Sequence, residues 1–140
     1  MPPNSVYAGE LSDMVTCYQA GDCLAHPTFF DSCANVVLEA MSTGLSVVAS
    51  NVCGAHELVE DGKSGFVLAV TGKKREIRDQ WLKTLQLLGT DEGLRRRMGT
   101  AGREAMLGND FGHYVTRLEA FMRQVMERKN GPLQLQQLGR

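Results

Sequence analysis

The chain has 140 residues, of which 43% are hydrophobic and 22% are charged, and its formal net charge is −1. This length and composition predict one globular domain, and the small net charge argues against nucleic acid or an anionic membrane as the partner of the whole chain. No apolar run reaches the ~20 residues of a membrane-spanning helix, and the N-terminus lacks the positive and apolar regions of a signal peptide.

The four cysteines do not form the paired C-x-x-C spacing of many metal and redox sites, so we expect them to be reduced and to fill apolar space. Reduced cysteines are typical of a cytoplasmic protein. Cys33, Cys53 and His56 could be considered as metal ligands, but zinc sites usually show tight pairs of ligands, and we expect no metal here.

In chain order, the sequence patterns predict strands over residues 6–9, 22–27 and 45–50. Helices are predicted between them, over residues 11–20 and 32–43. Gly21 is expected to end the first helix. Ser32 is a suitable N-cap for the second helix, and Gly44 suits the position just past its last turn. Phe29 and Phe30 lie in the loop before this helix; each could be a core residue or a wall of a binding site, and we expect one of them in the core.

Farther along, the patterns predict a turn, a strand and three helices over residues 61–65, 66–70, 77–88, 90–106 and 111–128. The strands over 22–27 and 45–50 are expected to be buried, the second on both faces because it is a nearly continuous β-branched run. Ile77 and Trp81 lie on one helical face, which predicts core packing. Residues 95–97 are three arginines, which we expect on a solvated face.

Strands and helices alternate with short links, which predicts an α/β fold with a parallel, Rossmann-like sheet flanked by helices. We expect this domain to occupy residues 1–128 and a flexible tail to follow over 129–140. In such sheets ligands bind at the carboxyl ends of the strands, where Gly9, Asp31 and Gly54 are expected to lie. Gly54 also permits a close backbone approach or a positive φ.

Two acids belong to the region of the predicted helix over 32–43. Asp31 directly precedes the helix, and Glu39 lies within it. A helix rises ~1.5 Å per residue, so Ser32 and Glu39 are roughly 10 Å apart along the axis. Between them lie the free N–H groups of the first turn, which favour a phosphate group. A ligand with a central pyrophosphate and a hydroxyl-rich group at each end fits this spacing, and a nucleotide sugar is such a ligand.

The segment D-S-C-A-N-V-V-L-E, from Asp31 to Glu39, follows His26-Pro27 and precedes E-A-M-x-x-G, which ends at Gly44. It resembles the E-x7-E region of retaining GT-B glycosyltransferases of family 4 (group 1), and this variant is similar to that of bacterial enzymes that build lipopolysaccharide cores. The resemblance is specific over residues 22–68 and weaker over 6–121. It implies the C-terminal, donor-binding domain of a GT-B fold.

The resemblance further implies that a sugar is transferred from a nucleotide-sugar donor, most simply a UDP-sugar, to an acceptor hydroxyl with retention and without a metal or other cofactor. By position, the donor sugar would contact Asp31, Ser32, Cys33 and Ala34. The phosphates would be bound by Cys33, Ala34, Asn35, Val36, Gly9 and Gly54. Glu39 would bind the ribose. Such an enzyme would work in lipopolysaccharide or cell-envelope glycan synthesis, in the cytoplasm or at the inner face of the membrane.

Several positions depart from the family's pattern. Asp31 stands where glutamate is commoner in the family, and Cys33 stands where an aromatic residue is common. Ala34 stands where glycine is frequent, and Ser46 stands where proline is usual. The first three are expected to alter the sugar preference or the fit around phosphate. For His26, a hydrogen-bonded histidine at a strand end is a better expectation than a direct catalytic role.

A full chain of this family carries an acceptor-binding domain first, and the first two strands of its donor-binding domain have no counterpart before Val6. We therefore expect an incomplete domain with one exposed sheet edge, where the missing part or another chain would pair, and a homodimer is predicted from this edge. The isolated chain is expected to have little or no activity alone. The alternative function is a non-catalytic module that binds a nucleotide sugar or a partner chain.

Overall fold

The computed structural model describes residues 3–109 and 111–127. The chain divides between residues 107 and 108 into two compact units, and each is described by itself. The first unit contains α1 (Met14–Ala20), β1 (Cys23–His26), α2 (Asn35–Thr43), β2 (Ser46–Ser50), the 3₁₀ helix η1 (Gly54–Leu58), β3 (Gly65–Leu68), α3 (Lys74–Thr90) and α4 (Glu92–Leu107). The second unit contains α5 (Phe111–Glu127).

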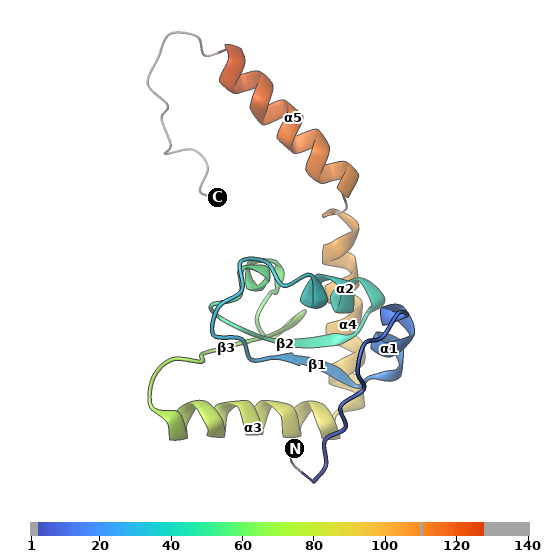
Figure 1. Cartoon of the computed structure of the whole chain (residues 1–140), viewed down its shortest axis with the longest axis vertical. Helices are drawn as coiled ribbons and strands as arrows, with labels where there is room; N and C mark the ends of the chain where they lie inside the picture. Colours follow the sequence, from blue (N-terminus) through green and yellow to red (C-terminus); the bar gives the residue numbers. More distant parts are fainter. Residues whose placement is uncertain (1–2, 110, 128–140) are drawn as a thin grey trace. The chain divides into compact units, whose positions relative to one another are not determined.

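The three strands of the first unit form a parallel sheet in the order β1-β2-β3 (Figure 1). The central strand, β2, is buried at all of its residues, as its β-branched run predicts. Its side chains alternate between the two faces: Val47 and Ala49 belong to one core cluster, and Val48 belongs to another. A strand covered on both faces needs helices on both sides, and the predicted α/β, Rossmann-like fold is confirmed.

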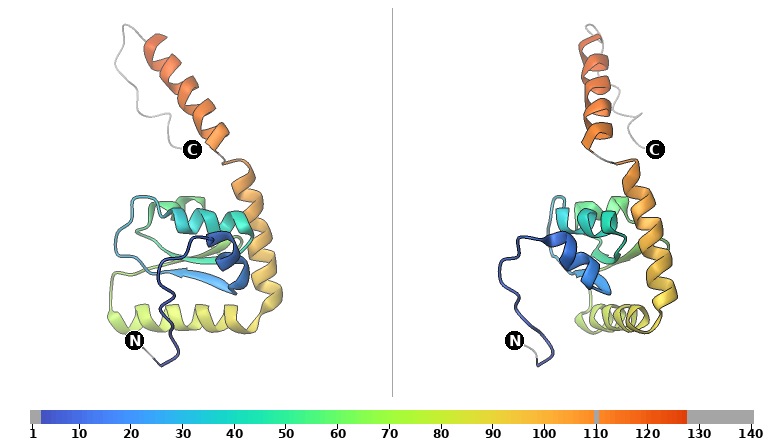
Figure 2. Two further views of the ribbon diagram at one scale, coloured as in Figure 1. Left: turned by 45° about the vertical axis from the view of Figure 1, so that its right-hand side comes forward. Right: turned by 90° about the vertical axis from the view of Figure 1, so that its right-hand side faces the viewer.

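Helices α2 and α3 cover opposite faces of this sheet, as the views in Figures 1 and 2 agree. On the α2 side, Val37, Ala40 and Met41 are fully buried with the side chains of β2. On the α3 side, Trp81 and Leu88 pack in the second core cluster, so the predicted helical stripe is indeed core. Helix α4 contacts α2, β2 and α3 and joins the layers at one side of the sheet.

The predicted strand over residues 6–9 is wrong. These residues have no strand structure, and the Val6 side chain is 92% exposed. A strand needs a neighbour that pairs with its backbone, and none of the three described strands pairs with this segment. The strand predicted over 22–27 exists as β1, but it is a partly exposed edge strand rather than a buried one. Its outer side is a free edge within the described residues, as expected.

Two expectations about single side chains also fail. Neither Phe29 nor Phe30 is in the core, since both are exposed in the loop after β1. Arg95 is not on a solvated face: it is 18% exposed, its guanidinium donates to the carbonyl O of Leu88, and it pairs with Asp22 at 3.0 Å. This arginine therefore ties the start of α4 to the end of α3 and to the residue before β1.

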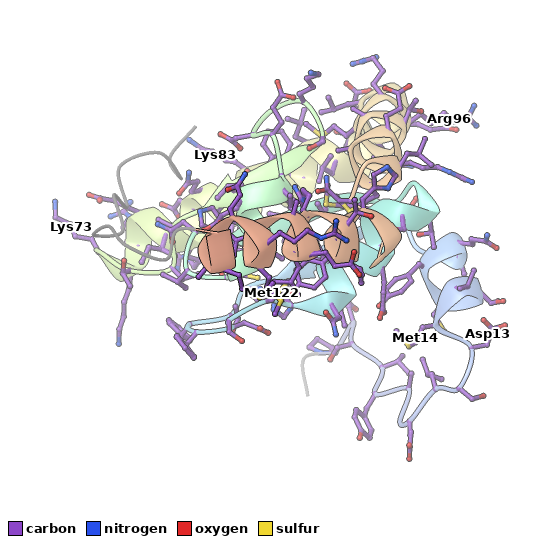
Figure 3. All side chains as sticks on the ribbon, turned by 90° about the horizontal axis from the view of Figure 1, so that it is seen from above. Asp13, Met14, Lys73, Lys83, Arg96 and Met122 are labelled. Atoms are coloured by element: carbon purple, nitrogen blue, oxygen red, sulfur yellow. The ribbon has the colours of Figure 1, made fainter. Side chains whose placement is uncertain are left out.

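Helix α5 has the amphipathic pattern that the sequence predicts. Leu118, Phe121, Met122 and Val125 recur at helical spacing and are exposed in the described structure. Figure 3 labels Met122 on this helix. The predicted tail over 129–140 and the last residue of the predicted helix lie outside the described residues. No helix among residues 3–109 and 111–127 is long and apolar enough to cross a membrane.

Candidate functional site

The start of α2 differs from the prediction in one respect. The helix begins at Asn35 with Ala34 as its N-cap residue, and no side chain caps it, so the assignment of Ser32 as N-cap is wrong. Instead, Asp31 Oδ1 accepts a hydrogen bond from the Cys33 N–H at 3.1 Å. This local turn competes with capping by Ser32 and places the helix start two residues later. At the other end, Gly44 lies just past the last turn, as predicted, and adopts the left-handed conformation with φ of 83°.

The loop before α2 is packed directly against the start of η1. The Gly54 N–H donates to the Asp31 carbonyl O at 2.8 Å, and Asp31 and Cys53 form a parallel bridge. A Cβ atom on Gly54 would overlap the Ser32 carbonyl O and lie 2.8 Å from its carbonyl carbon. The close backbone approach expected at Gly54 is confirmed, and the backbone position of Asp31 is fixed by it.

The Asp31 side chain faces His26, the last residue of β1. Asp31 Oδ2 lies 3.5 Å from His26 Nε2, and the two side chains are 34% and 24% exposed. The Nε2 atom has no hydrogen-bond partner in the described part of the chain, so the expected hydrogen-bonded histidine is not found. The Asp31 carboxylate therefore lies between the His26 ring and the Cys33 N–H, which donates to it.

The second acid, Glu39, has a partner on α1. The Tyr18 hydroxyl donates to Glu39 Oε2 at 2.9 Å, and Tyr18 is 5% exposed. Burial, and then the hydrogen bond from Tyr18 to the Glu39 carboxylate, raises the pKa of Tyr18 to about 12 from its ordinary value of 10.0. The sequence places Tyr18 on the apolar face of a helix, but nothing in that pattern shows that its hydroxyl reaches Glu39.

This raised pKa predicts a pH dependence of stability. The folded chain holds the Tyr18 proton more tightly than the unfolded chain, so unfolding releases the proton between pH 10 and about 12, and stability falls as pH rises through this range. The contribution is complete below pH 10. Urea unfolding of the wild type and of Tyr18→Phe from pH 9 to 12 should show the stability advantage of tyrosine shrinking with pH. An advantage that stays constant would contradict this account.

The residues predicted to bind phosphate are only partly brought together. Asn35 and Val36 lie in the first turn of α2, where N–H groups have no acceptor within the helix, while the Cys33 N–H is used by Asp31. Gly9 has a positive φ of 72°, but it lies in the segment without strand structure, and nothing packs within 4 Å of its Cβ position. The helix start between Asp31 and Glu39 therefore remains the centre of the site.

A mostly apolar groove lies beside the loop that carries Asp31. It is lined by Pro27, Phe29, Val70, Thr71, Gly72, Lys74, Ile77, Arg78 and Trp81. Phe29 is thus exposed at the wall of a groove rather than buried in the core. Among the described residues, no three His, Cys, Asp or Glu side chains lie close enough to hold a metal ion.

Comparisons with known proteins show the family of the chain. The family model described as "Glycosyl transferases group 1" matches residues 1–87. The capsular polysaccharide biosynthesis glycosyltransferase CapM of Staphylococcus aureus is 30% identical over 102 residues, which cover 73% of this chain and 26% of CapM. The family match includes the segment from Asp31 to Glu39.

Two solved structures share the fold. WaaG, a glycosyltransferase involved in lipopolysaccharide biosynthesis, matches 67% of this chain and 24% of its own with a TM-score of 0.60 and 28% identity. The C-terminal domain of LpcC, a group 1 glycosyl transferase of Francisella tularensis, matches 71% of this chain and 50% of its own with a TM-score of 0.61 and 20% identity. The chain thus spans about a quarter of CapM and of WaaG. Since the family model covers more than half of the sequence, the chain belongs to the group 1 glycosyl transferases.

Proposed function

We propose that this chain is the donor-binding part of a retaining glycosyltransferase and that its donor is a nucleotide sugar, most simply a UDP-sugar. The observation that carries the proposal is the start of α2, where no side chain caps the helix and the N–H groups of Asn35 and Val36, which lie between Asp31 and Glu39 in the chain, have no acceptor within the helix. A nucleotide sugar has two negative phosphates between two hydroxyl-rich groups. The phosphates of such a ligand would therefore face the N–H groups of the helix start, and its hydroxyl groups would face the carboxylates of Asp31 and Glu39.

In the proposed mechanism, the N–H groups of Asn35 and Val36 stabilise the charge on the departing diphosphate. Asp31 accepts hydrogen bonds from the donor sugar, and Glu39 accepts them from the ribose. The acceptor hydroxyl attacks on the same face as the leaving group through an oxocarbenium-like state, and its proton passes to the leaving phosphate. The two acids do not act as the acid–base pair of a glycosidase, whose carboxyl groups flank a single bond.

The acceptor is proposed to be a cell-envelope glycan, such as a lipopolysaccharide core. The support is the description of two similar proteins: WaaG is involved in lipopolysaccharide biosynthesis, and CapM in capsular polysaccharide biosynthesis. We place the reaction in the cytoplasm or at the inner face of the membrane. The acceptor-binding domain would be supplied by a part of the protein that lies outside the region matched here.

Calorimetry with UDP-glucose and UDP tests the roles of the two acids. Asp31→Ala should lower the affinity for UDP-glucose by about tenfold and the affinity for UDP by less than about twofold, because only the intact donor carries the sugar. Glu39→Ala should lower the affinity for both ligands by about tenfold, since both carry the ribose. Glu76→Ala, which removes an exposed acid on α3, is the matched control.

Equal losses in the two variants for both ligands would contradict these role assignments. The second candidate function is a module without transferase activity of its own that binds a nucleotide sugar or a partner chain. Adding the separately expressed acceptor-binding domain of the same protein distinguishes the two. Transfer of the sugar supports the enzyme, whereas donor binding without transfer supports the module.

A further inference from the structure

Folding brings Tyr18 and Glu39 together although they lie 21 residues apart in the sequence. Glu39 is exposed on α2, and its long side chain could adopt many rotamers. Tyr18 belongs to the same core cluster as Val37 and Met41 and has little freedom to move. Their hydrogen bond of 2.9 Å therefore joins a fixed donor to an acid that would otherwise be ordered only by its ligand.

The position of Tyr18 is fixed from both ends of α1. Asp13 accepts hydrogen bonds from the Thr16 N–H at 3.1 Å and from the Thr16 hydroxyl at 2.6 Å at the start of the helix, where Figure 3 labels Asp13 and Met14. The Gly21 N–H donates to the Tyr18 carbonyl O at 3.3 Å at its end. Helix α1 also packs on α2, so the phenol is held in place by the fold rather than by a ligand.

We propose that Tyr18 is a positioning residue for the nucleotide, which holds one carboxylate oxygen of Glu39 so that the remaining acceptor sites are ready for the ribose. This inference rests on the proposed function, because it assigns a partner to the ribose-binding acid. A carboxylate offers about four acceptor positions, so a bond from Tyr18 leaves enough of them for a vicinal diol. Holding Glu39 in advance removes part of the entropy lost when a free side chain is ordered by binding.

The ionisation of Tyr18 agrees with this role. A tyrosine keeps its proton at neutral pH even at its ordinary pKa of 10.0, and burial and the bond to Glu39 raise the pKa of Tyr18 further, so the phenol is a hydrogen-bond donor throughout the range in which nucleotide binding is measured. The Glu39 carboxylate, which only accepts hydrogen bonds when ionised, is a matching partner. Replacing the hydroxyl alone should therefore loosen Glu39 while the packing of the ring is kept.

The test is calorimetry of the 140-residue chain with two probes, UDP and 2′,3′-dideoxyuridine diphosphate, which lacks both ribose hydroxyls. Tyr18→Phe should lower the affinity for UDP by about tenfold, which is about 1.4 kcal/mol of binding free energy, and the affinity for the dideoxy probe by less than about twofold. Tyr7→Phe, at an exposed tyrosine, should change neither affinity. In a Glu39→Leu background, Tyr18→Phe should have no further effect, because the acid that it positions is absent.

Equal losses for the two probes, which a purely structural role of Tyr18 would produce, would overturn the inference. So would an additive loss in the double variant, or no loss of UDP affinity in Tyr18→Phe. The proposed function fails in a different way: Glu39→Leu would then leave UDP binding unchanged, or the wild-type chain would bind neither probe. A selective loss of UDP in Glu39→Leu without one in Tyr18→Phe would contradict the inference and leave the proposed function in place.

Discussion

Gly99→Ala should destabilise the first unit by about 3 kcal/mol. Gly99 lies in α4, where a Cβ atom would overlap the carbonyl O of Gly44 and lie 2.8 Å from its carbonyl carbon. Both groups are backbone, so no side chain can rotate to make room. Gly44 ends α2 in the left-handed conformation, with its N–H donating to the last turn, so it cannot move without disturbing that helix. The helices must then separate where α4 crosses the end of α2.

The measurement is the free energy of unfolding in urea. Gly89→Ala is the matched control, because Gly89 is also a helical glycine but its Cβ position has nothing within 4 Å. Alanine is the better helix former, so this control should be neutral or stabilising by up to about 1 kcal/mol. A loss of stability no larger for Gly99→Ala than for Gly89→Ala would show that α4 and α2 are not packed backbone to backbone.

Gly54→Ala should abolish most of the donor binding. The added Cβ would overlap the carbonyl O of Ser32, and the hydrogen bond from the Gly54 N–H to the Asp31 carbonyl O holds the two segments together at this point. Relieving the overlap moves the loop that carries Asp31 and starts α2. We expect an affinity loss of about a hundredfold for UDP-glucose, with a destabilisation of about 2 kcal/mol.

Calorimetry with UDP-glucose measures the affinity, and urea unfolding of the same samples measures the stability. Gly21→Ala is a suitable control, since its Cβ would make ordinary contacts of 3.6–3.8 Å. This control should keep the wild-type affinity within about twofold. If Gly54→Ala binds the donor as tightly as the control does, the loop before α2 is not part of the donor site.

The sequence predicted those features that depend on neighbours in the chain. The β-branched run of β2, the stripe with Ile77 and Trp81, and the end of α2 at Gly44 are all found where they were expected. Each follows from a local rule: apolar period for the strand and helix, and the tolerance of glycine for positive φ. The Asp31–Glu39 segment also identified the family, because its residues occur at a fixed spacing.

Features that depend on a partner far along the chain were missed or wrong. The apolar residues 6–9 resemble a strand, but pairing requires a neighbouring strand that the described fold does not provide. Arg95 stands in a run of three arginines, and only the position of Asp22 and of the end of α3 draws it inward. The N-cap expected at Ser32 is not formed, since the hydrogen bond of Asp31 to the Cys33 N–H makes a local turn there and the helix starts only at Asn35.

By itself, the sequence determined the α/β class, the group 1 family and the two acids at a spacing of eight residues, because these depend on periodicity and on short-range motifs. Only the tertiary structure decided which remote group holds one of these acids, the Tyr18 hydroxyl on Glu39, and how His26, the last residue of β1, meets the other. The physical reason is that hydrogen bonds form between atoms a few ångströms apart, and packing of α1 on α2 sets that distance for residues remote in the chain.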